Sequence, residues 1–400
     1  MVRLFRRETT SKEFIPVIDG LRFLAIIMVV MFHADGYITT KSAELAFAPG
    51  FDWNARVGNP FPYGTQGVKL FFVISGFILA VPFLRYYLGL SERKPGIRAY
   101  FLRRLTRLEP PYIISTLLIF LLLVFVMGNK YPLGTLIPSL FYSLFYVHTI
   151  VLPGEFPYIN PVTWSLEVEV QYYILAPFIV GAICLLKDKV KRRMLTLVLI
   201  LAFATLSWMI DIYWGMRFDS LASFLHYFLA GILLCDIFLL DREALEMQRG
   251  WPMFLVGLIL LVPILTVDHS MSRMLWLRML SPLMILAFYL IVFGNRWWNR
   301  IFSLNGLTLI GGMCYTIYLL HYILIAAVGR FTMGRLYVQN YYVFYWLQTA
   351  VFLTVVLAVS AVYFLLIEKP CMKRDWYIKL YEKFRGLAFF GGKSTLEEKV

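Results

Sequence analysis

Three ionisable side chains lie within an otherwise apolar stretch, residues 18–34, that has the composition of a membrane-spanning helix. They are Asp19, Arg22 and His33. A helix would place Arg22 and His33 on nearly the same face, about 16 Å apart along its axis. Ionisable groups in a span usually face a bundle interior or a wet cavity. The stretch therefore predicts an interior site with a fixed cation and a titratable group, although a packing histidine and a snorkelling arginine would give the same pattern.

Two carboxylates lie in a second apolar segment, WSLEVEVQYY, which begins at Trp164. They are Glu167 and Glu169, and a helix would place Ser165 one turn before Glu169, with Gln171 close by. Carboxylates are common at a wet helix start because they suit the helix macrodipole. Beside polar and aromatic neighbours inside a span, they also fit a catalytic or sugar-binding site. The residues alone leave both interpretations open.

Four arginines occur close together in the segment RAYFLRRLTRLEPPY. They are Arg98, Arg103, Arg104 and Arg107, and the spacing of Arg103 and Arg107 puts this pair on one helical face. Guanidinium groups bind phosphates through paired N–H donors. The cluster is therefore a candidate phosphate site, but anchoring at anionic headgroups predicts the same composition.

Other polar residues in apolar surroundings give weaker signals. Ser75 precedes Gly76 in GVKLFFVISGFILA, where small residues allow close helix approach, and we assign Gly76 to packing. His321, in GGMCYTIYLLHY, is a second histidine expected in the outer half of a span. His148 and His226 are also in apolar context, and we interpret both as structural.

The composition predicts an all-α, polytopic membrane helical bundle. The chain has 400 residues, of which 60% are hydrophobic, and a mean hydropathy of +0.71, well above a soluble domain. The net charge of +14 favours basic cytoplasmic loops and contact with anionic lipids rather than nucleic acid. The four cysteines have no metal-ligand spacing, so we expect no metal site.

About ten transmembrane helices are expected, with both termini cytoplasmic. This arrangement puts 28 of the 38 basic residues inside, provided that the short apolar segment 135–152 does not cross. We expect a cytoplasmic segment 1–16, a transmembrane domain 17–370 and a cytoplasmic tail 371–400. The expected spans are 17–38, 67–88, 108–128, 162–186, 194–214, 219–240, 251–267, 274–293, 305–328 and 341–367.

Taken together, these segments resemble acyltransferase family 3, the integral-membrane acyltransferases that modify surface glycans and other acceptors. The resemblance runs from about residue 15 to 374 and includes the family's pattern of arginine, ten residues and histidine, met by Arg22 and His33. The sequence departs from the pattern at Lys69, Val170 and Cys314, which concern the acceptor side. The other matching elements are FFVISGF (71–77), RRLTRLEPPY (103–112), WSLEVEVQYY (164–173), CYTIYLLH (314–321) and IEKP (367–370).

The resemblance implies an O-acyltransferase of the cell membrane. It would move an acyl group, acetyl in most members, from cytoplasmic acyl-CoA to a hydroxyl of an extracytoplasmic glycan, either directly or through an acyl-enzyme. Its implied catalytic residues are His33, Arg22 and Glu169. The donor would bind at Arg98, Arg103, Arg104 and Arg107, and the substrate at Ser75, Trp164, Ser165, Gln171 and His321.

A transporter or lipid translocase is the competing class. It would also place histidine, arginine and glutamate inside a bundle with basic cytoplasmic loops. Such proteins usually have inverted repeats and paired broken helices, which the sequence does not display. A non-catalytic scaffold is a third possibility, in which the polar side chains would not converge.

Overall fold

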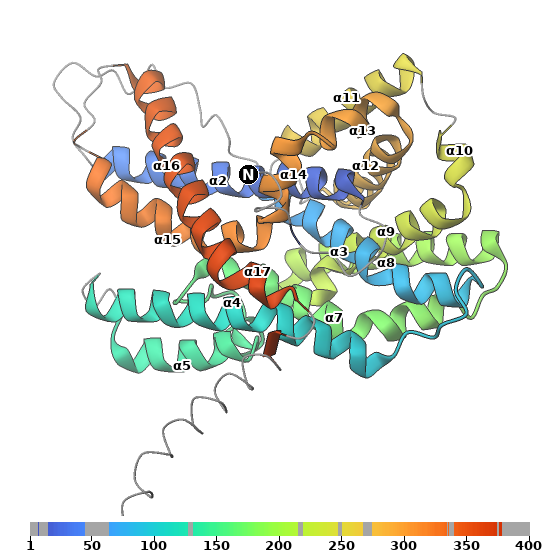
Figure 1. The fold of residues 1–400 in the computed structure, drawn as a ribbon, viewed down its shortest axis with the longest axis horizontal. Coiled ribbons are helices and arrows are strands. Elements are labelled where there is room, and N and C mark those ends of the chain that lie inside the picture. Colours follow the sequence, from blue (N-terminus) through green and yellow to red (C-terminus); the bar gives the residue numbers. More distant parts are fainter. Residues whose placement is uncertain are drawn as a thin grey trace, which may run out of the picture.

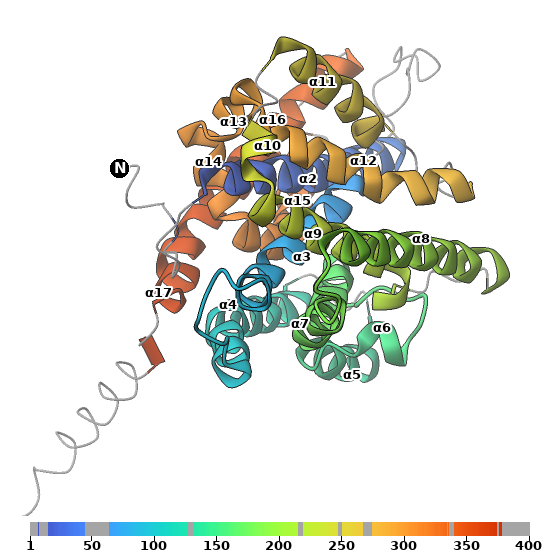
Figure 2. The same cartoon turned by 90° about the vertical axis from the view of Figure 1, so that its right-hand side faces the viewer.

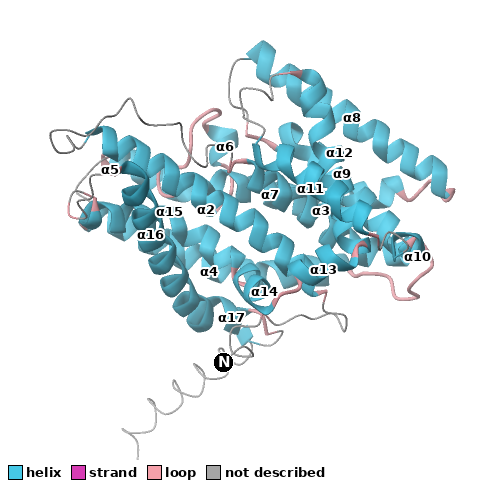
Figure 3. Ribbon diagram, turned by 90° about the horizontal axis from the view of Figure 1, so that it is seen from above, coloured by secondary structure: helices cyan, strands magenta, loops and turns pink. Residues whose placement is uncertain are grey.

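The computed structural model describes residues 7, 15–44, 64–126, 131–214, 219–246, 250–266, 274–333, 335, 340–373 and 376–377. Throughout these ranges the chain forms helices joined by loops, without a strand (Figure 3). The all-α prediction is therefore confirmed. Most of the predicted segments 1–16 and 371–400 fall outside the described residues.

Nine helical segments in the described part are long and apolar enough to cross a membrane. Their helices are α2 (Pro16–Glu44), α3 (Gln66–Tyr87), α4 (Ile97–Phe125), α7 (Trp164–Ile183), α8 (Lys189–Trp214), α9 (Leu221–Leu240), α12 (Leu275–Gly294), α15 (Cys314–Thr332) and α16 (Tyr341–Tyr363).

The tenth predicted span, 251–267, is the shorter helix α11 (Trp251–Thr266). Its 16 residues extend about 24 Å, less than the roughly 30 Å of a bilayer core. The segment 135–152 forms α5 (Leu133–Leu144) and the single turn α6 (His148–Val151), and neither is long enough to cross. The remaining short elements are η2 (Pro161–Thr163), α10 (Arg242–Glu246), α13 (Arg296–Phe302) and α14 (Asn305–Gly312).

Helix α2 lies in the middle of the bundle (Figures 1 and 2). It packs against α3, α13, α14, α15 and α16. Glycines allow two of these close approaches: a Cβ at Gly67 would lie 2.4 Å from the carbonyl oxygen of Ala25, and one at Gly311 only 1.7 Å from that of Asp19. On this central helix the side chains of Asp19 and Asp35 are buried, and those of Arg22 and His33 are partly buried.

Helices α3 and α9 also pack closely against each other. A Cβ at Gly76 would lie 2.2 Å from the carbonyl oxygen of Phe228, and one at Gly231 would lie 2.2 Å from that of Val73. Both sides of this contact therefore need a residue without a side chain. The assignment of Gly76 to packing is confirmed.

Two helices continue beyond their predicted spans in ways that matter for the site. Helix α4 begins at Ile97, well before the predicted start at residue 108, so that the arginine segment is part of the helix. Helix α16 continues through a π-helical turn, η4 (Phe364–Glu368), into α17 (Lys369–Cys371). π turns within helices are frequent at functional sites, and this one carries the buried carboxylate of Glu368.

Candidate functional site

The two intramembrane histidines face each other across helices α2 and α15. The Nε2 atom of His321 lies 3.2 Å from Nδ1 of His33, and the two ring centroids are 5.0 Å apart. His321 is fully buried, whereas the side chain of His33 is partly exposed. The ring of Tyr322 meets His33 edge-on at 5.4 Å. The sequence predicted an interior position for each histidine but not their contact.

Their hydrogen bonds define the tautomers. Nδ1 of His321 lies 2.7 Å from the carbonyl oxygen of Tyr318 and 3.0 Å from that of Ile317, and Nδ1 of His33 lies 2.8 Å from that of Val29. A carbonyl oxygen only accepts, so each neutral ring carries its proton on Nδ1. Nε2 of His321 is then the acceptor that faces His33. Nε2 of His33 keeps a free lone pair, because it has no hydrogen bond among the described residues.

A polar contact between α7 and α15 supports the buried histidine. The hydroxyl groups of Ser165 and Tyr318 lie 3.0 Å apart, and Tyr318 also donates to the carbonyl oxygen of Val162. Because the carbonyl of Tyr318 accepts the proton of His321, these bonds fix the helical turn that orients that ring. Ser165, predicted to bind substrate, is thus placed behind the histidine pair.

Two other predicted substrate residues on α7 contact the neighbouring helix α9. The indole of Trp164 packs against the ring of Phe224 at 5.4 Å. The Oε1 atom of Gln171 accepts a hydrogen bond of 3.0 Å from the backbone N–H of Leu221, at the start of α9. Gln171 therefore satisfies an N-terminal amide of that helix.

Arg22 lies near the other end of α2, in an ion-pair network. Its Nη1 atom is 2.9 Å from Oδ1 of Asp19, and Nε of Arg7 is 2.8 Å from Oδ2 of the same carboxylate. Asp19 is 1% exposed, so one buried carboxylate pairs with two arginines and leaves the group with a net positive charge. A buried carboxylate that accepts from two guanidinium groups holds both in fixed positions.

The arginines of α4 divide into two pairs. Arg98 and Arg103 are exposed, whereas Arg104 and Arg107 turn inward and have buried Nε atoms without a hydrogen-bond partner in the described part of the chain. The guanidinium of Arg104 lies between the rings of Tyr100 and Tyr173, with its central carbon 4.8 Å and 4.9 Å from the two centroids.

Arg107 belongs to the same charged region as Arg22. It interacts electrostatically with Arg22, Arg104 and the buried carboxylate of Glu368, which accepts a hydrogen bond from the hydroxyl of Thr316. We call Arg7, Arg22, Arg104 and Arg107 the inner arginine cluster. Buried N–H groups are rarely left unpaired, so the two free Nε–H groups favour an anion as the missing partner.

Glu169 lies with the inner arginine cluster rather than with the histidines. Its Oε1 atom accepts a hydrogen bond from the hydroxyl of Ser75, and it interacts electrostatically with Arg22. No contact joins Glu169 to His33 among the described residues. The neighbouring acid, Glu167, is fully buried and accepts a 2.9 Å hydrogen bond from the backbone N–H of Thr149, which ties α6 to α7.

The structure therefore has two polar centres joined by one helix. Because α2 is continuous from Pro16 to Glu44, Arg22 and His33 remain about 16 Å apart along its axis. The histidine centre can exchange a proton, and the arginine centre can bind an anion. In the described part of the chain, no three His, Cys, Asp or Glu side chains are grouped in a way that could hold a metal ion.

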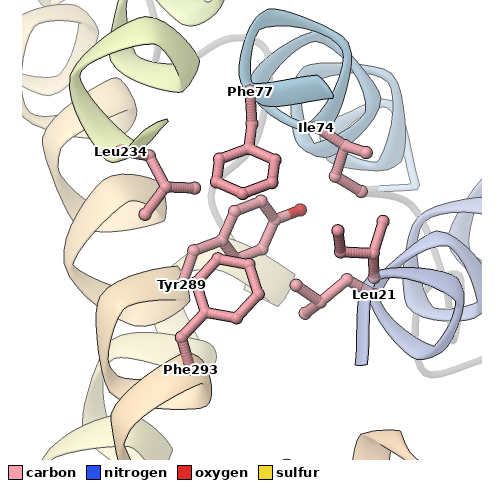
Figure 4. Close-up of a pocket in the computed structure, with 7 residues that line it drawn as sticks. Leu21, Ile74, Phe77, Leu234, Tyr289 and Phe293 are labelled. Atoms are coloured by element: carbon pink, nitrogen blue, oxygen red, sulfur yellow. The ribbon is translucent and has the colours of Figure 1, made fainter. Parts of the chain in front are cut away.

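A small apolar pocket between α2, α3, α9 and α12 is separate from both centres. Figure 4 shows Leu21, Ile74, Phe77 and Phe293 converging on it around the ring of Tyr289. The hydroxyl of Tyr289 donates to the carbonyl of Leu70 at 3.2 Å, so it is already satisfied. The pocket offers no group for proton transfer or anion binding.

Several residues that belong to or contact the inner arginine cluster were not predicted as site residues from the sequence. Arg7 lies before the first span and Glu368 after the last full turn of α16, where both are easily taken for loop charges. For Asp19 the sequence predicted an ionisable side chain within a span but no ion pair. Its position three residues before Arg22 is the one local signal that could have predicted the pair.

The sequence profile described as an acyltransferase domain matches residues 15–365. No solved structure matches the chain.

Three curated relatives carry acetyltransferase names. A putative peptidoglycan O-acetyltransferase of Bacillus subtilis, YrhL, is 28% identical over 210 residues, or 50% of this chain. The peptidoglycan O-acetyltransferase OatA of Listeria monocytogenes is 26% identical over 212 residues, or 51% of this chain. A putative O-acetyltransferase of Staphylococcus aureus is 25% identical over 352 residues, or 83% of this chain. The matches cover only 29%, 30% and 54% of these relatives' own lengths. Because the profile spans most of the sequence, the chain belongs to the membrane acyltransferase family defined by this acyltransferase domain.

Proposed function

We propose that this chain is an O-acyltransferase that moves an acetyl group from cytoplasmic acetyl-CoA to a hydroxyl of an extracytoplasmic glycan. The observation that carries the proposal is the free Nε2 lone pair of His33, held in place by His321 and Val29. A fixed, neutral imidazole with an open nitrogen is suited to act as a general base.

In the proposed reaction the acceptor hydroxyl gives its proton to Nε2 of His33 while its oxygen bonds to the thioester carbonyl carbon. The tetrahedral intermediate then collapses, and the carbon–sulfur bond breaks. The imidazolium returns the proton to the departing CoA thiolate, which leaves as the thiol. His321 is a positioning residue here, because it contacts His33 and not the reacting atoms.

The inner arginine cluster supports binding of the donor's phosphates. Its unpartnered Nε–H groups, at Arg104 and Arg107, are buried and would donate to phosphate oxygens. Arg22 would position the donor together with these two. Since Arg22 lies about 16 Å from His33 along α2, we do not assign it to the thioester carbonyl. The flexible pantetheine arm of CoA would bridge this distance.

The remaining predicted residues receive supporting roles in the proposal. Glu169 and Ser75 would hold Arg22 in place from α7 and α3. Trp164 and Gln171 would hold the start of α9 against α7. Arg98 and Arg103 are exposed, so we place them at anionic headgroups rather than on the donor.

The basic composition of the arginine end supports an orientation in which this end faces the cytoplasm and the histidine pair lies nearer the outside. We propose residues 17–370 as the catalytic unit, with 1–16 and 371–400 as cytoplasmic extensions. The names of the Listeria and Bacillus relatives make peptidoglycan the first acceptor to try.

The test uses the purified protein in detergent with acetyl-CoA labelled in the acetyl group and soluble peptidoglycan fragments. We expect label on fragment hydroxyl groups, and its loss in His33→Ala. Label retained on the protein without fragments would replace direct transfer by an acyl-enzyme. Absence of any acetyl transfer, together with transport of glycan in vesicles, would favour the translocase class instead.

A further inference from the structure

A groove lies away from both polar centres, where α3 and α7 end and α4 begins. Its volume is about 340 Å³. Its walls are mainly apolar, with Tyr86, Tyr87 and Phe178 among the aromatic side chains that line it. On the α7 side Gly181 lies close to Tyr87, since a Cβ at this position would be 3.3 Å from the Tyr87 hydroxyl oxygen. The groove is therefore wide enough and apolar enough for a hydrocarbon chain.

Two cations border this groove. Lys94 lines it directly, and Nζ of Lys187 lies 6.0 Å from the ring centroid of Tyr87. Both lysines are exposed. Besides Lys94, the segment 92–98 contains two further basic residues and one acid, so it adds a net charge of one to the rim. The groove thus combines an apolar wall with a cationic rim.

This combination matches the chemistry of a lipid with an anionic headgroup. The groove lies at the ends of three membrane-crossing helices, which is the depth at which phosphates and acyl chains meet. A groove with only an apolar wall would bind any lipid, and a groove with only a cationic rim would bind any anion. We propose that the groove binds one anionic phospholipid, with its phosphate between Lys94 and Lys187 and an acyl chain along Tyr86 and Phe178.

The groove also adjoins the wall that positions Arg104. Phe83, one of the lining residues, packs edge-on against Tyr100 with ring centroids 5.3 Å apart. The ring of Tyr100 also contacts the guanidinium of Arg104, and its hydroxyl donates a 3.1 Å hydrogen bond to the carbonyl of Tyr173. A bound acyl chain would therefore support the aromatic pair between which Arg104 lies.

The experiment measures lipid retention by native mass spectrometry of the full chain released from micelles. Phosphatidylglycerol and phosphatidylcholine with identical acyl chains are supplied in equal amounts. One surface lysine favours an anionic headgroup by about fivefold, so two predict a preference of about 25-fold for phosphatidylglycerol. The double variant Lys94→Glu/Lys187→Glu should abolish this preference. Lys191→Glu, at an exposed lysine that does not line the groove, is the matched control and should keep it.

A second variant tests the apolar wall. Gly181→Leu places a side chain in the groove and should lower retention of both lipids, whereas Gly306→Leu, at a glycine with open space around it, should not. Equal retention of the two lipids by the wild type would overturn the proposal, as would an undiminished preference in the double lysine variant. Displacement of phosphatidylglycerol by coenzyme A would also overturn it, because the groove would then belong to the donor site. If Gly181→Leu does not fold, the double lysine variant still tests the proposal, because both of its substitutions are at exposed positions.

Discussion

The unequal roles of the two histidines lead to a quantitative prediction. In the proposed mechanism only His33 exchanges a proton with the acceptor, because only its Nε2 atom is free. Removing a general base lowers the rate by about 10²- to 10⁴-fold. His33→Ala should therefore reduce kcat/KM by that factor.

His321 should matter far less. Its loss removes the acceptor 3.2 Å from Nδ1 of His33, but the same Nδ1–H remains bonded to the carbonyl of Val29 at 2.8 Å, which keeps the tautomer. One such neutral hydrogen bond contributes about 0.5–1.5 kcal/mol, which corresponds to about a two- to tenfold change in rate. His321→Phe keeps a ring of similar volume in this buried position and should reduce kcat/KM by that amount.

The assay compares kcat/KM for acetyl transfer from labelled acetyl-CoA to soluble peptidoglycan fragments in the wild type, the two single variants and the double variant. Coenzyme A affinity serves as the control, because the inner arginine cluster is about 16 Å from His33 along α2 and should bind equally in all four proteins. Thermal unfolding midpoints check that each variant is folded.

Two results would refute the reasoning. A loss above about 100-fold in His321→Phe with a smaller loss in His33→Ala would make His321 the base. Equal losses in the singles and the double variant would mean that the pair acts as one unit, and the free Nε2 lone pair would no longer identify a separate role for His33.

Three further predictions concern the rest of the bundle. Arg104→Ala and Arg107→Ala should each weaken coenzyme A binding by about 10- to 150-fold, which is the range expected for the loss of a hydrogen bond to a charged group. If calorimetry gave an unchanged Kd, these arginines would instead be interpreted as anchors at lipid headgroups. Asp19→Ala should lower the free energy of unfolding by about 3 kcal/mol because it leaves two inward guanidinium groups unpaired, and an unaltered denaturation midpoint would contradict the ion-pair network. Gly231→Ala should lower stability by about 1–3 kcal/mol through its contact with the backbone of Val73, while Gly306→Ala, in open space, should leave the melting temperature within experimental error.

The sequence was most informative where local periodicity carries the signal. The apolar spans were recognisable from length and composition, and the spacing of Arg22 and His33 predicted two polar positions on one continuous helix. The structure describes α11 only as far as Thr266, so the crossing of the tenth predicted span, 251–267, stays a prediction. The segment 135–152 divides into two short helices at Tyr146, whose φ is 56°, whereas its one proline, Pro138, lies inside α5, so the sequence did not mark this break.

Contacts between residues far apart in the sequence could not be predicted from the sequence alone. His33 and His321 are 288 residues apart, and no local pattern tells which residue on α15 faces α2. The same holds for Glu169, which shares a motif with residues beside the histidine pair but points to Ser75 and Arg22 instead. Helical spacing predicts which residues share one face of a helix. The relative position of two neighbouring helices along their axes depends on packing, including the close contacts at Gly67 and Gly311.

The length of α2 bears on how the proposed reaction would proceed. Arg22, which belongs to the inner arginine cluster, and the free imidazole nitrogen of His33 lie at separate positions on α2, and packing on several sides holds this helix in place. A donor anchored at Arg104 and Arg107 must therefore extend along α2 to deliver its thioester. An acceptor needs to reach only His33, whose side chain is partly exposed. The two substrates would then approach Nε2 from opposite directions, which allows transfer across the bundle without requiring either substrate to cross the membrane.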